Sequence, residues 1–200
     1  MKSFFLATLL VASTSTYGQM LQFAPNKSTV NWEGSKVVGS THVGTLDIRS
    51  GYIEFKNKEP TKGQVVVNMK SIKNTDVTDP TWNKKLVGHL HSDDFFSTAK
   101  FPEARIYVDK FTKKGDGKYE MQGKLTIKNI SQPITFMGDL TSDDTSVKGL
   151  TAQLEFDRTK FDVKYNSKSF FDVAKDKIIS DTIKVKVDLQ LKSPFKTASN

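Results

Sequence analysis

The sequence predicts an all-β protein of one domain, in which one short helical segment interrupts an antiparallel sheet of about eight strands. Apolar and polar residues alternate with a period of two along most of the 200 residues, and clusters of turn-forming residues separate the alternating segments. A sheet with one apolar face must either pack on a second sheet or curl closed. Closure into a barrel also removes exposed strand edges.

The first 18 residues have the composition of a secretory signal peptide. Lys2 precedes an apolar run over residues 4–12, and small or polar residues follow it. The run is too short to span a bilayer. We therefore expect cleavage before Gln19, a barrel domain over residues 19–192, a flexible tail over residues 193–200, and a periplasmic or secreted protein.

Each predicted strand has one apolar face. The last one is the clearest, since Ile183, Val185 and Val187 alternate with lysines and an aspartate. In the second strand the apolar register shifts by one residue beside Gly51, which predicts a bulge or a tight bend. The predicted strands cover residues 28–38, 42–56, 64–72, 104–111, 118–130, 132–140, 149–156, 158–166 and 183–191.

Residues 79–102 form the only long departure from the period of two. Trp82, Leu86 and Leu90 recur every fourth residue, which places them on one face of a helix, and we expect this face to meet the barrel. Asp79 is a suitable N-cap and Pro80 suits the first helical position. The segment is predicted to plug, line or gate the structure that the strands build.

Composition excludes several classes of function. The chain has no cysteine, so disulfides, thiolate metal sites and cysteine catalysis are absent. The formal charge is +8, but the lysines are scattered, and neither a basic helix nor an aromatic stacking platform for nucleic acid accompanies them. The charge permits a weak peripheral attraction to anionic membranes. The oligomeric state stays open, a dimer included.

Four segments, taken in order, resemble the YceI-like proteins, an exported bacterial family that binds polyisoprenoids. The best markers are the H-x-G element at His42–Gly44 and the L-x-S-x-D-F-F element at Leu90–Phe96. The resemblance implies a lipocalin-like antiparallel barrel with a helix inserted mid-chain, whose apolar bore holds an isoprenoid lipid or quinone without catalysis. The matching segments are residues 28–55, 85–106, 123–136 and 156–191.

Candidate wall residues of that bore are those with inward register on the strands, one ring of an aromatic doublet, and two leucines of the insert. His42, in a turn-rich run, is the candidate for bonding a ligand head group. The predicted wall consists of Trp32, Val67, Leu86, Leu90, Leu125, Phe161, Phe170, Val185 and Val187.

Other functions stay open at this level. The histidine pair His89 and His91 beside Asp93 and Asp94 suggests either a zinc site, a carboxylate acid/base pair, or local capping of a turn by Ser92 or Asp93. No nucleophile-elbow glycine pattern supports a serine hydrolase. An interaction module whose barrel is filled by its own side chains is a further alternative.

Overall fold

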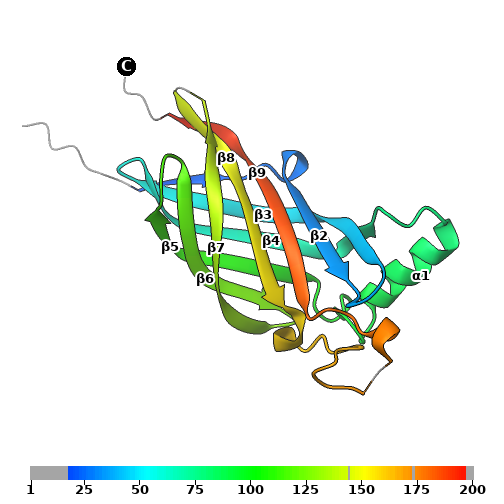
Figure 1. Cartoon of the computed structure of the whole chain (residues 1–200). Coiled ribbons are helices and arrows are strands. Elements are labelled where there is room, and N and C mark those ends of the chain that lie inside the picture. Colours follow the sequence, from blue (N-terminus) through cyan, green and yellow to red (C-terminus); the bar gives the residue numbers. More distant parts are fainter. Residues whose placement is uncertain (1–17, 144, 173, 197–200) are drawn as a thin grey trace, which may run out of the picture.

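The computed structural model describes residues 18–143, 145–172 and 174–196. Within them, strands β2 to β9 close into an antiparallel barrel, because β3 pairs with β4 as well as with β2 (Figure 1). The short β1 adds to β3 beside the barrel. This closed barrel confirms the predicted fold class. The strands are β1 (Gln19–Gln22), β2 (Thr29–Ser35), β3 (Thr41–Lys56), β4 (Glu59–Asn74), β5 (Glu103–Lys113), β6 (Lys118–Ile127), β7 (Ile130–Ser142), β8 (Ser146–Asp157) and β9 (Thr182–Lys196).

Alternation along each strand sends apolar side chains into the barrel. On β8, Leu150, Ala152 and Leu154 are buried, whereas Gln153 and Glu155 between and beyond them are exposed. The pairing of β3 with β4 shifts register between Ile48 and Ser50, so the irregularity predicted beside Gly51 is a bulge. Bulges of this kind bend a strand and help a sheet to close.

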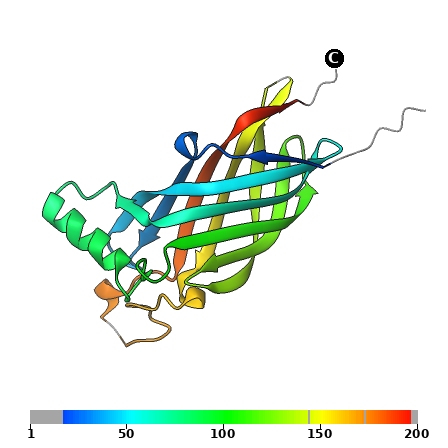
Figure 2. The same ribbon diagram turned by 180° about the vertical axis from the view of Figure 1, so that it is seen from behind.

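The only α-helix in the described ranges is α1 (Pro80–His91), between β4 and β5. Asp79 caps it by accepting hydrogen bonds from the backbone N–H groups of Thr81 and Trp82, at 2.8 and 2.9 Å, as the sequence predicts. Figure 2 shows α1 leaning away from the barrel end at its first turn. For this reason Trp82 is 63% exposed, and the expectation that it faces the barrel is wrong.

Two segments differ from their predicted structure. Residues 158–166 are not a strand: η2 (Arg158–Phe161) is a 3₁₀ helix that ends at Asp162, whose φ of 58° is left-handed. The barrel also does not end at residue 192, because β9 continues to Lys196 and the buried Phe195 stacks on Phe55 with ring centroids 4.4 Å apart. The predicted leader, except Gly18, and residues 197–200 lie outside the described residues.

The two ends of the barrel are built differently. At one end Phe55, Phe195 and the buried Tyr119 close the interior, and the Tyr119 hydroxyl donates a hydrogen bond to Glu59. At the other end lie α1 and the segment after β8, which also contains the short 3₁₀ helix η3 (Lys175–Lys177) (Figure 1). A third 3₁₀ turn, η1 (Pro25–Lys27), joins β1 to β2. No helix among the described residues is long and apolar enough to cross a membrane.

Candidate functional site: an apolar cavity in the barrel

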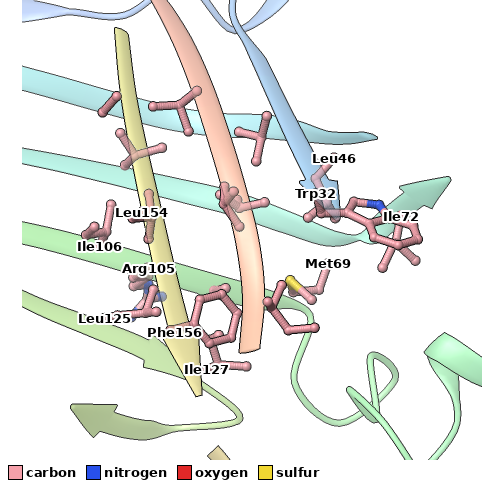
Figure 3. A pocket seen from close by; sticks show the side chains of 18 of the residues that line it. Trp32, Leu46, Met69, Ile72, Arg105, Ile106, Leu125, Ile127, Leu154 and Phe156 are labelled. Carbon is pink, nitrogen blue, oxygen red and sulfur yellow. The ribbon is translucent and has the colours of Figure 1, made fainter. Parts of the chain in front are cut away.

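The interior of the barrel contains a cavity of about 320 Å³. Every strand from β2 to β9 contributes apolar side chains to its wall, and α1 contributes two leucines. Figure 3 shows part of this wall, with Trp32, Leu46 and Leu154 among the labelled side chains. Pockets that bind small molecules begin at about this size and are mostly apolar. Representative wall residues, taken from each strand and from the helix, are Val30, Leu46, Val67, Ile106, Leu125, Phe136, Leu154, Val185, Leu86 and Leu90.

The cavity exists because some inward side chains do not meet across the barrel. Val67, Val185 and Val187 occupy inward positions and line the cavity, yet each is only partly buried. Leu189, farther along β9, also lines the cavity but is 3% exposed because it packs in the closed part of the core. Protein interiors are normally close-packed. Partly buried valines on the inner face therefore mark space that the chain itself leaves unfilled.

Most of the predicted wall residues line this cavity; their contact with a ligand stays a prediction. Phe170 does not line it, because it lies in an irregular segment outside the barrel and is 51% exposed. Phe161 does not line it either. It is 2% exposed, and it packs edge-on behind the cavity-lining Phe156 at 5.5 Å, because η2 turns the chain away from the strand direction. The predicted residues that do line the cavity are Trp32, Val67, Leu86, Leu90, Leu125, Val185 and Val187.

Trp32 is fixed in place by close backbone packing. Its indole Nε1 donates a hydrogen bond to the Lys73 carbonyl at 3.1 Å. The ring lies over Gly44, where a Cβ atom would sit 2.6 Å from the indole and 1.8 Å from the same carbonyl. Gly44 therefore has a steric reason to lack a side chain. The contact sets the position of the indole in the cavity wall.

We expect Gly44→Ala to destabilise the protein by about 1–3 kcal/mol, because the new methyl must displace Trp32 or the β4 backbone. Chemical denaturation measures this loss. Gly88→Ala is the matched control, since nothing lies within 4 Å of a Cβ at this helical position. It should stabilise the protein by up to about 1 kcal/mol. Equal effects of the two substitutions would contradict the steric role of Gly44.

His42 lies at the α1 end of the cavity wall and is held by Asp76. Its Nδ1 is 2.8 Å from Asp76 Oδ2, and the backbone N–H of Val43 donates to the other carboxylate oxygen at 2.8 Å. Partial burial works to raise the pKa of Asp76, but the hydrogen bonds from Val43, His42 and Asn74 outweigh it, so the pKa lies below its ordinary value of 3.8. The site thus orients an imidazole ring beside an ionised carboxylate.

The Asp76 contribution to stability should depend on pH in a defined direction. Because folding lowers the pKa of this carboxyl, its contribution is fully present above the ordinary value of 3.8 and is lost as pH falls through the folded-state pKa. The unfolding free energy of the wild type should exceed that of Asp76→Asn by up to about 1 kcal/mol at neutral pH. Urea denaturation should show this difference shrinking below about pH 4. A difference that is constant with pH would contradict the ionic role.

The other two histidines make separate contacts. His89 lines the cavity; its Nε2 is 3.0 Å from Asp94 Oδ2, and its ring packs edge-on against Phe95 and Tyr165. The His91 Nδ1 is instead 2.8 Å from the Thr98 hydroxyl.

Asp93 and Asp94 also have different partners. Asp93 pairs with Lys100 at 2.7 Å, whereas Asp94 pairs with His89. Ser92 ends α1 by donating from both its backbone N–H and its hydroxyl to the His89 carbonyl. The segment is therefore a capped turn in which the two carboxylates have different partners, and this arrangement favours the structural interpretation.

Sequence reasoning missed Arg158, which lines the cavity and is 1% exposed. Its guanidinium donates to the carbonyls of Val163, Ile179 and Ser180 at 2.8–3.1 Å and to the Asp181 carboxylate at 3.3 Å. Burial lowers the pKa of Arg158, although a guanidinium stays protonated in proteins. The sequence does contain a signal for its inward position, because Arg158 continues the inward register of Leu154 and Phe156 at a spacing of two.

Polar cavity-lining residues around this end include His42, His89, Tyr165 and Arg158, whereas most residues of the barrel wall are apolar. A closed eight-stranded antiparallel barrel with an apolar cavity and polar groups at one end defines a lipocalin-like barrel. The chain belongs to the YceI-like family: the model of the YceI-like domain matches residues 21–191. This confirms the resemblance seen in the sequence.

Relatives and solved structures agree with this assignment. A UPF0312 protein of Shewanella denitrificans is 26% identical over 175 residues, which cover 82% of this chain and 89% of the relative. Another, from Vibrio parahaemolyticus, is 31% identical over 110 residues, or 54% of each chain.

Among solved structures, Burkholderia cenocepacia BcnA has a TM-score of 0.64 at 20% identity and covers 84% of this chain and 98% of its own. A polyisoprenoid-binding domain from Saccharophagus degradans, implicated in plant cell wall breakdown, has a TM-score of 0.60 at 15% identity and covers 88% of this chain and 100% of its own. At these identities the two structures establish the shared fold.

Proposed function

We propose that this protein binds a long-chain isoprenoid lipid or isoprenoid quinone in the barrel cavity, as a periplasmic carrier or sequestering protein, without covalent chemistry. The observation that carries the proposal is the unfilled apolar cavity, whose wall includes partly buried valines on the inner face of the barrel. A barrel filled by its own side chains would leave no such volume. The polyisoprenoid-binding domain from Saccharophagus degradans shares the fold and supports the ligand class.

The energetics suit a ligand of this class. Burying about ten methylene equivalents of an isoprenoid chain yields roughly 8 kcal/mol before association costs. After the costs of association and ordering, micromolar or tighter binding is reasonable. No covalent bond or metal is needed to reach that affinity.

The head group of the ligand is proposed to lie at the α1 end. His42 and His89 line the cavity there, and each side chain is 35% exposed, so each can bond a polar group while the isoprenoid chain fills the apolar interior. Their carboxylate partners Asp76 and Asp94 hold the two rings in position. A quinone oxygen or a phosphate is the kind of group that these rings can bind.

The direct test is purification of the natively exported protein, organic extraction and mass spectrometry of the extract. We expect an isoprenoid chain at a substantial fraction of the protein concentration. Protein unfolded before the final purification step and refolded without lipid is the matched control, and it should release none. Folded native protein that yields no long-chain apolar molecule, and that also fails to take up added geranylgeraniol, would overturn the proposal.

A further inference from the structure

Five apolar side chains are strongly exposed around the α1 end of the barrel. They come from three segments that are distant in the sequence: the β2–β3 connection, the first turn of α1, and the connection between η2 and η3. Figures 1 and 2 both show these segments at the same end, opposite the β7–β8 turn. We call this set the apolar rim: Val37, Val38, Trp82, Phe170 and Phe171, each between 48 and 63% exposed.

The backbone that carries the rim is held by specific hydrogen bonds. The N–H groups of Phe170 and Phe171 both donate to the Ser167 carbonyl, at 3.2 and 3.0 Å. Ser167 is itself fully buried, and its hydroxyl donates to Asp181 at 3.0 Å. In the neighbouring connection, the N–H of Val37 donates to the Ile178 carbonyl at 2.9 Å. The fold therefore holds these apolar side chains in solvent, where they add nothing to the stability of the isolated protein.

Cations accompany the aromatic rings of the rim. The Lys85 Nζ lies 4.3 Å from the ring centroid of Trp82, and the Lys164 Nζ lies 5.1 Å from that of Phe170. Segments 35–43, 76–88 and 164–178, which carry the rim, contain seven lysines and four aspartates and no glutamate. One of those aspartates, Asp76, is paired with His42. Exposed aromatic and aliphatic side chains with lysines between them suit the headgroup layer of an anionic bilayer.

We propose that the apolar rim docks the α1 end of the barrel on the surface of an anionic lipid bilayer. The rings and valines enter the headgroup layer, and the lysines contact lipid phosphates. Docking by this end brings the polar end of the cavity, at His42 and His89, to the bilayer. The inference goes beyond the proposed function, because docking requires only the rim and is independent of what the cavity holds.

Trp82 provides a built-in reporter, since the chain has only two tryptophans. The difference between the emission spectra of the wild type and Trp82→Phe isolates its signal. Vesicles of phosphatidylglycerol and phosphatidylcholine should shift this signal to shorter wavelength, and brominated lipids should quench it. Neutral phosphatidylcholine vesicles or high salt should weaken binding at least tenfold. No shift and no quenching with anionic vesicles would overturn the proposal.

Two double variants distinguish binding through the rim from nonspecific adsorption of exposed apolar side chains to vesicles. Phe170→Ser with Phe171→Ser should weaken vesicle binding at least tenfold, since both rings lose their insertion. The matched control is Met20→Ser with Met137→Ser, which removes two side chains of 56 and 47% exposure outside the rim. Its vesicle binding should be unchanged. An equal loss in both double variants would contradict the assignment.

Two further measurements decide between the rim's possible occupants and between the two proposals. Sedimentation equilibrium of the wild type and of the Phe170→Ser, Phe171→Ser variant shows whether the rim joins two copies of the chain. If the wild type is a dimer, the variant is a monomer and neither binds vesicles, the partner of the rim is a second copy of the chain and not a bilayer. The organic extraction is read separately. If the extract contains no lipid but the protein binds vesicles, the docking proposal holds and the lipid-binding proposal fails. If the extract contains lipid but the protein does not bind vesicles, the lipid-binding proposal holds and the docking proposal fails.

Discussion

Arg158→Ala should lower the free energy of unfolding by about 3–5 kcal/mol, which corresponds to a fall in Tm on the order of 10 °C. The substitution removes the one group that joins the Val163, Ile179 and Ser180 carbonyls, and it leaves Asp181 without its cation. It also opens a void at a residue that is 1% exposed. Thermal and chemical denaturation measure the loss.

Two further substitutions test whether the loss of stability comes from the buried guanidinium and its hydrogen bonds. Arg158→Lys should recover less than half of the lost stability, because an ammonium cannot reproduce the planar fork of donors. Arg105→Ala is the matched control, since its side chain is 59% exposed and pairs with Glu103 on the barrel surface. It should cost less than about 1 kcal/mol. Similar losses for Arg158→Ala and Arg105→Ala would show that burial of the guanidinium is unimportant.

Filling the cavity should weaken ligand binding about a hundredfold while the barrel stays folded. Val185→Phe with Val187→Phe places two rings on the inner face of β9, where both valines line the cavity. Excluding about four methylenes of a bound chain costs roughly 3 kcal/mol, or about a hundredfold in affinity. Native mass spectrometry with added geranylgeraniol measures the bound fraction.

The control for the filled cavity is Met137→Phe, on the outer face of β7 and 47% exposed, which should bind as the wild type does. Thermal denaturation of the double variant shows that it folds, with an expected cost of about 1–3 kcal/mol from overpacking. Undiminished binding by a folded Val185→Phe, Val187→Phe variant would place the ligand elsewhere.

The sequence specified the eight strands β2 to β9 and their inner faces, although it also predicted a strand at residues 158–166, where η2 lies. Leu125, Val185 and Val187 could be assigned inward from alternation alone, because a period of two fixes which side of a sheet each residue occupies. The helix cap at Asp79 and the bulge beside Gly51 were also predicted from residues that are close in the sequence, and both predictions are confirmed. Such features depend on neighbours in the chain, and these neighbours are visible in the sequence.

Only the tertiary structure decided whether the barrel is filled, because an empty volume depends on the distance between walls built by eight strands. It also decided the outward positions of Trp82 and Phe170 and the packed position of Phe161, since α1 leans away from the barrel and η2 turns the chain out of strand geometry. The Arg158 network joins residues up to 23 positions apart. An apolar residue type is compatible both with burial in the core and with a surface for a partner, and the folded arrangement decides between them.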